Sequence, residues 1–167
     1  IACDESADTI GKRFEAANVQ NTMENRRIYR EILFKAKGAN KLLSGAILDP
    51  ETLMQKDSND VFFPYVLHGM NIIPGVKPHL KVYELPGIEE TVMQGLDSLA
   101  ARCKTYYEQG ARFTKWRSPL EIDIDNARPT RLAIESNMRD LARFALISQS
   151  EGLVPLVEPD VIMNGNH

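Results

Sequence analysis

Short apolar segments alternate along the chain with longer segments whose apolar positions follow helical spacing. We expect strands within residues 1–3, 43–48, 72–77, 110–117 and 153–160. The segments between them carry apolar residues every three to four positions, which is typical of amphipathic helices. Strands that alternate with helices favour a parallel sheet covered by helices. The pattern therefore predicts an α/β fold.

Local signals place the helices more closely. Asn21 is predicted to cap a helix, because Glu24 three positions later completes a capping box. Asp49 is predicted to cap another, since Pro50 suits the first turn. Helices are also predicted for residues 91–109 and 130–151. The predicted inward-facing residues are Ile28, Ile32 and Leu33 in the helix after Asn21, and Leu132, Met138, Leu141, Ala142, Ala145 and Leu146 in the last helix.

Composition limits the classes of protein that remain. A chain of 167 residues with 43% hydrophobic and 26% charged residues suits one globular domain, which we place at residues 1–167. A net charge of −3 gives no support for a nucleic-acid or membrane-surface partner. Two cysteines make no disulfide framework, so we expect a reducing compartment, the cytoplasm. Because the chain begins with Ile1 and not with Met, we expect it to be a piece of a longer protein, truncated at both ends.

Charged side chains mark the ends of four of the five predicted strands, where no helix cap explains them. In parallel α/β folds, ligands bind beyond the carboxyl ends of the strands, so these residues predict one shared site. A lysine among carboxylates suits carbonyl chemistry, either as an electrostatic partner or as a Schiff-base former. The residues are Asp4 with Glu5, Lys77, Lys115 with Arg117, and Glu158 with Asp160.

Two interpretations of the fourth strand stay open. Strand alternation places Lys115 and Arg117 on one face with Phe113, and Trp116 on the other face. If the first face is enclosed, the cations need acids or an anionic ligand nearby. They are otherwise surface residues of an edge strand. In the last strand we expect residues 153–157 to be buried.

Hydroxyl and guanidinium groups near the start of the chain suit phosphate oxygens. Ordinary roles are available for each of them as well: a turn serine, a helix-capping threonine and solvated arginines. These residues are Ser6, Thr9, Arg13 and Arg26.

Several of these stretches occur together and in order, and there the sequence closely resembles class I fructose-bisphosphate aldolase. The resemblance implies an eight-stranded (β/α) TIM barrel, of which this chain covers roughly the first five βα units, in a glycolytic enzyme that is usually a homotetramer. It implies cleavage of fructose 1,6-bisphosphate to dihydroxyacetone phosphate and glyceraldehyde 3-phosphate through a Schiff base, with no metal or cofactor. The stretches are residues 3–6, 24–27, 94–97, 107–117 and 153–159.

The resemblance also implies roles for single residues. Asp4 lies beside the reacting carbons, Lys115 stabilises the carbinolamine electrostatically, and Glu158 is the general acid/base. Asp160 stands where a second catalytic glutamate is usual. The positions that match the family's substrate-binding residues, largely phosphate-binding, are Ser6, Thr9, Arg13, Arg26 and Lys77, with Arg117 nearby.

The sequence departs from the family at several positions. Asp160 is one methylene shorter than the usual glutamate, Asp8 replaces a common glycine, and residues 78–81 differ from the usual pattern. The family's Schiff-base lysine lies on the sixth strand, whereas the last lysine here is Lys115. We therefore expect that lysine beyond residue 167, and we expect residues 1–167 alone to be inactive.

Two other functions compete with an aldolase of this class. A non-catalytic protein that keeps the barrel as a scaffold, for instance for a cytoskeletal partner, would lack the sixth-strand lysine. A metal-dependent aldolase is disfavoured, because His68, His79 and His167 show no metal-ligand spacing.

Overall fold

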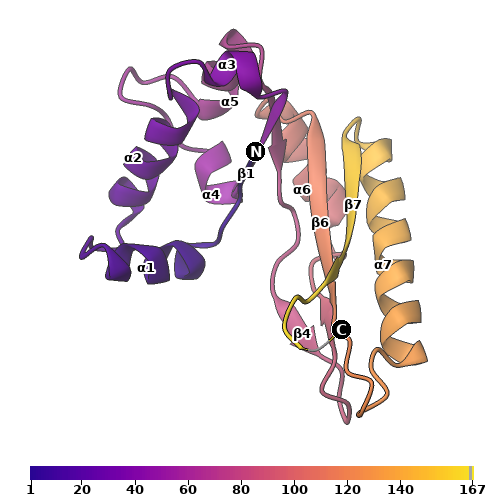
Figure 1. The fold of residues 1–167 in the computed structure, drawn as a ribbon. Helices are drawn as coiled ribbons and strands as arrows, with labels where there is room; N and C mark the ends of the chain where they lie inside the picture. The colour runs from indigo at the N-terminus through magenta and orange to yellow at the C-terminus, as the bar shows by residue number, and fades with distance from the viewer. Residues whose placement is uncertain (166) are drawn as a thin grey trace. The chain divides into compact units, whose positions relative to one another are not determined.

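The computed structural model describes residues 1–165 and 167. Strands and helices alternate along the chain, as the sequence pattern predicts (Figure 1). Five of the strands form one sheet in the order β1-β2-β3-β6-β7, and β4 and β5 form a second, two-stranded sheet. The chain divides into two compact units, residues 1–77 with 105–113 and residues 78–104 with 114–167.

Three parallel strands organise the first unit. Ala2 and Cys3 pair with Ile47 and Leu48, and Leu48 pairs in turn with Val76. All three strands therefore end at the same level of the sheet, which brings the residues that follow them together. The strands are β1 (Ala2–Cys3), β2 (Gly45–Leu48) and β3 (Ile73–Val76).

Helices bury the apolar residues of this unit. The rings of Phe34 and Phe63 meet edge to face with centroids 5.3 Å apart, in a core that also holds Phe14, Leu53 and Leu67. The helices are α1 (Ala7–Ala16), α2 (Met23–Phe34), α3 (Ala39–Leu42), α4 (Pro50–Leu53) and α5 (Phe63–Gly69).

Helix α2 differs from its sequence-based prediction. Its N-cap is Thr22, whose Oγ1 accepts a hydrogen bond from the Asn25 amide at 3.1 Å, and not Asn21. The helix buries Arg30 and Phe34, whereas Ile28 and Ile32, predicted to face inward, are exposed. Helix α2 turns the face that carries Arg30 inward, because Arg30 has its ion-pair partner, Glu5, inside the unit.

Phe113 explains two glycines in the strands. A Cβ atom on Gly75 would lie 2.3 Å from the Phe113 ring, and one on Gly45 would lie 3.2 Å from it. Side chains at these positions would therefore overlap the ring. The glycines of β2 and β3 leave the space that Phe113 fills.

The second unit begins with an antiparallel pair of strands. Residues 91–93 form β5 and pair with β4, so the prediction of a helix from residue 91 is wrong for this segment. The helix begins at Leu99. The elements here are β4 (Val82–Glu84), β5 (Thr91–Met93), α6 (Leu99–Glu108, which continues into the first unit), β6 (Phe113–Leu120), α7 (Arg131–Ser150) and β7 (Val154–Val161).

Helix α7 also buries a face different from the predicted one. Leu141 is buried as predicted, but Leu132, Met138, Ala142 and Leu146 are exposed. Two of the buried positions are polar and have partners: Asn137 Nδ2 donates to the Thr91 carbonyl at 2.9 Å, and Ser148 Oγ bonds to Thr114 Oγ1 at 2.9 Å. Hydrogen-bonding partners inside the unit thus set the orientation of the helix.

Strand β6 alternates as predicted. Thr114, Trp116 and Ser118 are buried, and Trp116 lies against Phe144 with ring centroids 5.3 Å apart. Lys115 and Arg117 occupy the other, half-buried face. The edge-strand interpretation is wrong, because β6 lies between β3 and β7 in the sheet, and the face that carries these cations is half-buried and not fully enclosed.

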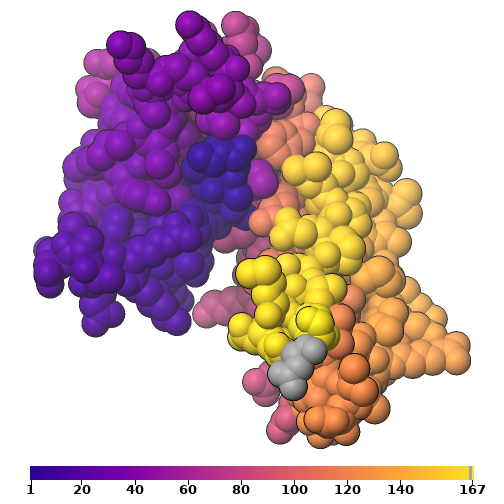
Figure 2. All heavy atoms as spheres, viewed as in Figure 1, coloured from indigo at the N-terminus to yellow at the C-terminus, as the bar shows by residue number. Residues whose placement is uncertain are grey.

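Strand β7 is more open than predicted. Leu153 is buried, but Val154 is 64% exposed, and Leu156 and Val157 are also exposed. Figure 2 shows this yellow segment uncovered on the face in view. Within the described residues β7 has β6 as its one neighbour in the sheet, so no described strand pairs with its second edge. No described helix is long and apolar enough to cross a membrane.

Candidate functional site

Three charged residues meet at the carboxyl ends of β1, β2 and β3. Asp4, Asp49 and Lys77 each follow the last residue of their strand. Lys77 Nζ donates to the Asp4 carbonyl oxygen at 2.5 Å and lies 3.1 Å from Asp49 Oδ2. Asp4 is buried, so this cluster combines a carboxyl group and an ammonium group at a shielded strand end.

Glu5, next to Asp4, is held by two arginines. Arg30, which is 2% exposed, donates from Nη1 to Glu5 Oε2 at 2.6 Å and from Nη2 to the Glu5 carbonyl oxygen at 2.8 Å. Arg13 pairs with the other carboxylate oxygen. Burial raises the pKa of Glu5, but the hydrogen bond from Arg30 and the charges of both arginines outweigh it and hold the pKa below its ordinary value. The backbone between β1 and α1 is thereby fixed at its side chain and at its carbonyl.

Ser6 and Thr9 lie together at the start of α1. Ser6 is the N-cap, and its Oγ accepts from the Thr9 amide at 3.3 Å and lies 3.2 Å from Thr9 Oγ1. The capping role that the sequence offered is therefore present, but it belongs to Ser6 and not to Thr9. Two hydroxyls at a helix N-terminus also suit an anion.

The two arginines proposed for phosphate differ in their availability. Arg26 donates from Nε and Nη2 to both oxygens of Glu51, at 2.8 and 2.7 Å, and from Nη1 to Asn21 at 2.7 Å. The hydrogen bonds to Glu51 raise the pKa of Arg26 further. Arg13 is more than half exposed, and its Nη1 pairs with Glu5. Arg13 is thus open to a ligand, whereas Arg26 mainly joins α2 to α4.

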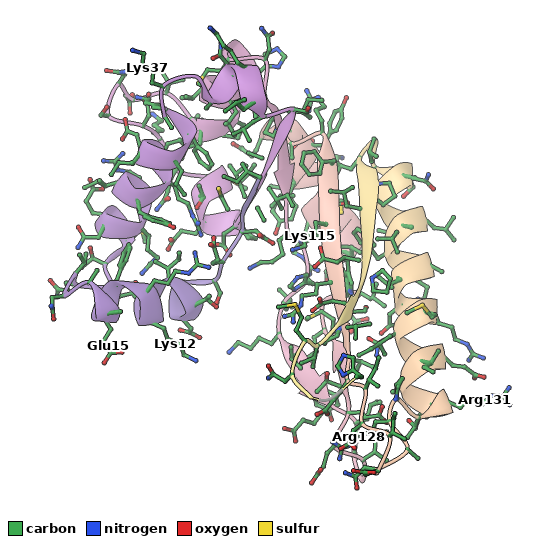
Figure 3. All side chains as sticks on the ribbon, viewed as in Figure 1. Lys12, Glu15, Lys37, Lys115, Arg128 and Arg131 are labelled. Atoms are coloured by element: carbon green, nitrogen blue, oxygen red, sulfur yellow. The ribbon has the colours of Figure 1, made fainter. Side chains whose placement is uncertain are left out.

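In the second unit, two cation–acid pairs join β6 to β7. Lys115 Nζ lies 3.2 Å from Glu158 Oε2, and Arg117 Nε lies 2.5 Å from Asp160 Oδ2. Lys115 extends from the half-buried face of β6 (Figure 3). Each of these cations therefore has an acid within ion-pair distance on the adjacent strand. A shielded cation on a strand face needs such a partner, because an unpaired charge there is costly.

Sequence reasoning missed three residues of these clusters as site elements. Asp49 was predicted only as a helix cap, a role it does fill, because its Oδ1 accepts from the Glu51 amide at 3.0 Å. Its position directly after an apolar strand was the signal for a second role. Arg30 and Glu51 gave no such signal, since their partners are distant in sequence.

No group of three or more His, Cys, Asp or Glu side chains in the described part of the chain is arranged to hold a metal ion. The chemistry that this arrangement offers comes from lysines, carboxylates, hydroxyls and a guanidinium. Such groups polarise carbonyls, transfer protons and bind phosphate. Asp4, Asp49 and Lys77 directly follow their strands, whereas the other predicted strand-end residues lie within β6 and β7; these are Lys115, Arg117, Glu158 and Asp160. Charged groups at the carboxyl ends of parallel strands are typical of (β/α)-barrel enzymes.

Comparison with known proteins defines the family. The family model for fructose-bisphosphate aldolase class-I matches residues 1–167. Curated relatives include fructose-bisphosphate aldolases of Dictyostelium discoideum and Plasmodium falciparum, each 49% identical over 100% of this chain and over 47% and 46% of their own lengths. A cytosolic aldolase of Arabidopsis thaliana is also 49% identical, over 100% of this chain and 46% of its own. The chain belongs to the class I fructose-bisphosphate aldolase family.

A solved structure agrees with this assignment. The P. falciparum aldolase, in a complex with TRAP and a small-molecule inhibitor, superposes with a TM-score of 0.97 at 49% identity, over 100% of this chain and 48% of that chain. The expected fold class, a partial (β/α)8 barrel, is confirmed. The chain spans about half the length of the curated relatives it matches.

Proposed function

We propose that the full-length protein is a class I aldolase that cleaves fructose 1,6-bisphosphate to dihydroxyacetone phosphate and glyceraldehyde 3-phosphate. Membership in the family over the whole chain supports the reaction class. The observation that carries the proposal is the pairing of Lys77 with Asp49 and with the Asp4 carbonyl just beyond β1, β2 and β3, together with the pairing of Lys115 with Glu158 between β6 and β7. A non-catalytic scaffold would have no need to keep these groups.

The proposed chemistry uses a Schiff base on a lysine of the sixth strand, outside residues 1–167. A substrate carbonyl condenses with that amine to a carbinolamine, which loses water to give the iminium ion. Lys115 stabilises the carbinolamine by its charge, and Glu158 donates the proton that leaves with the hydroxyl as water. A carboxyl–ammonium pair 3.2 Å apart is suited to this division of roles.

Asp4 is proposed to act beside the reacting carbons, and Asp160 to assist from the neighbouring position of β7. The iminium ion accepts the electron pair of the breaking carbon–carbon bond, while a base removes the proton of the substrate's C4 hydroxyl. The buried carboxyl of Asp4 suits a position next to a cationic intermediate.

Substrate binding is proposed to use hydroxyl, ammonium and guanidinium donors. The exposed Arg13 and the hydroxyl pair of Ser6 and Thr9 are the best supported, because they retain donors for phosphate oxygens. Lys77 and Arg117 carry charge but are already paired with acids. For Arg26, which binds Glu51 with two nitrogens, we propose an indirect role in holding α2 in place.

We also propose a cytosolic, homotetrameric protein that needs no cofactor. The Arabidopsis relatives described as cytosolic support the location. The tetramer rests on the family resemblance alone.

Trapping of the Schiff base tests the proposed function. Treatment of the full-length protein with dihydroxyacetone phosphate and borohydride should abolish cleavage, because reduction makes the lysine adduct permanent. EDTA alone should leave activity intact. Mass spectrometry should place the adduct on a lysine beyond residue 167. Loss of activity with EDTA, or an adduct on Lys115 or Lys77, would contradict the assignment, and a full-length sequence without a sixth-strand lysine would favour the scaffold.

A further inference from the structure

Asp49 occupies a position in the strand-end cluster that the proposed chemistry leaves without a role. The register of β1, β2 and β3 places it between Asp4 and Lys77, because Leu48 pairs with both Cys3 and Val76. The Lys77 amide also donates to the Leu48 carbonyl at 3.0 Å. Asp49 is therefore the central member of a row of three charged residues.

The two carboxylate oxygens of Asp49 contact different partners. Oδ1 accepts from the Glu51 amide at 3.0 Å and caps α4, while Oδ2 lies 3.1 Å from Lys77 Nζ. A cap alone needs one acceptor and no charge, so Ser, Thr or Asn would serve equally well. The negative charge is thus what distinguishes Asp49 from an ordinary cap.

This charge acts on a partly shielded ammonium. The side chains of Lys77 and Asp49 are 12% and 20% exposed, so solvent screens their attraction less than at an open surface. Of the three Lys77 protons, one bonds to the Asp4 carbonyl and one faces Asp49. An anion that approaches Lys77 therefore meets an ammonium whose charge is already balanced.

We propose that Asp49 is a specificity-determining residue that weakens the hold of Lys77 on phosphate groups. The inference rests on the proposed function, in which Lys77 binds a phosphorylated substrate. Asp49 lowers the affinity of this site for anions by neutralising Lys77 and by its own repulsion of phosphate. Release of phosphorylated ligands is thereby kept easy.

The test is Asp49→Asn in the full-length protein. Asparagine keeps the shape and the capping oxygen and removes only the charge. Inorganic phosphate, titrated by calorimetry, should bind about two- to fivefold more tightly, the range expected for loss of one partly exposed charge pair. The KM for fructose 1,6-bisphosphate should fall by a similar factor. Asp49→Ser, which also caps, should act in the same direction.

Matched variants separate charge from structure. Asp60→Asn removes the acid of the exposed Lys56–Asp60 pair, which includes neither Asp49 nor Lys77, and should leave phosphate binding unchanged. Combining Asp49→Asn with Lys77→Met should abolish the tightening, because the effect passes through Lys77.

The outcomes distinguish the two proposals. Weaker or unchanged phosphate binding by folded Asp49→Asn overturns the inference and makes Asp49 a tether or a cap only. If the wild-type protein binds phosphate but does not cleave the bisphosphate, the proposed function fails, and the phosphate titration still decides the role of Asp49. If the wild-type protein neither binds phosphate nor cleaves, both proposals fail.

Discussion

Replacement of Arg30 by methionine should destabilise the protein strongly. Arg30 is 2% exposed and makes two hydrogen bonds to Glu5, one to the carboxylate and one to the main-chain carbonyl. Methionine fills similar space but leaves the Glu5 carboxylate, which is 18% exposed, without its buried partner. An unpaired buried charge is one of the costliest defects in a protein interior.

The magnitude follows from the surroundings of Glu5. Removal of one partner of a buried ion pair costs about 3–5 kcal/mol. Glu5 retains the ion pair with the exposed Arg13, so we place the loss at the lower end, about 3 kcal/mol of unfolding free energy. The same change at Arg131, which is 92% exposed in its pair with Glu135, should cost below about 0.5 kcal/mol (Figure 3).

The loss should depend on pH in one direction. In the native protein the pKa of Glu5 lies below its ordinary value of 4.5, because the arginines outweigh the effect of burial. Such a group contributes stability above its unfolded pKa, and the contribution disappears as pH falls through the folded pKa. The difference between wild type and Arg30→Met should therefore be largest at pH 7 and shrink below about pH 4.5.

Urea denaturation of the full-length protein, followed by circular dichroism at pH 7 and pH 4, measures this difference. Arg131→Met serves as the control. A loss under 1 kcal/mol for Arg30→Met, or a loss that does not shrink in acid, would refute the argument that Arg30 compensates a buried carboxylate. Rescue by Glu5→Met in the double variant would support it.

Three further predictions concern other parts of the chain. Glu158→Gln should lower kcat about 10²–10⁴-fold in steady-state assays with little change in KM, and near-normal turnover would exclude proton transfer by Glu158. Gly75→Ala should cost about 1–3 kcal/mol in urea denaturation, because its Cβ would overlap the Phe113 ring, and Phe113→Leu should restore part of the loss. Cys3 should react with iodoacetamide at pH 8 far more slowly in the native than in the unfolded state, since burial raises its pKa to about 11; equal rates would contradict this.

Sequence alone determined the order of strands and helices and the residues at the strand ends. Short apolar segments that alternate with amphipathic helical segments predict a parallel βα sheet. Parallel strands bring their carboxyl ends to one edge of that sheet. Lys115 with Glu158 and Arg117 with Asp160 lie within β6 and β7 and not at their ends, and they meet because alternate residues of adjacent strands share a face. The family resemblance includes strand residues of this kind, in stretches 3–6, 107–117 and 153–159, together with stretches 24–27 and 94–97.

Tertiary structure decided which faces are buried and which charges are paired. Periodicity identified Ile28 and Ile32 as the inward face of α2, but an arginine with a buried partner prevailed over them. The same holds for Asn137 in α7, whose amide has a carbonyl to bind. Whether a polar residue is buried depends on a partner far away in sequence, and no local pattern contains that information.

The register of the sheet determines which charged residues meet. Asp49 follows its strand as Asp4 and Lys77 follow theirs, yet only the pairing of Leu48 with Cys3 and Val76 brings their side chains into one row. A shift of one residue would turn every side chain of a strand to the opposite face. The sequence therefore contains the charged residues of the site, and the hydrogen-bonded register of the sheet determines which of them meet.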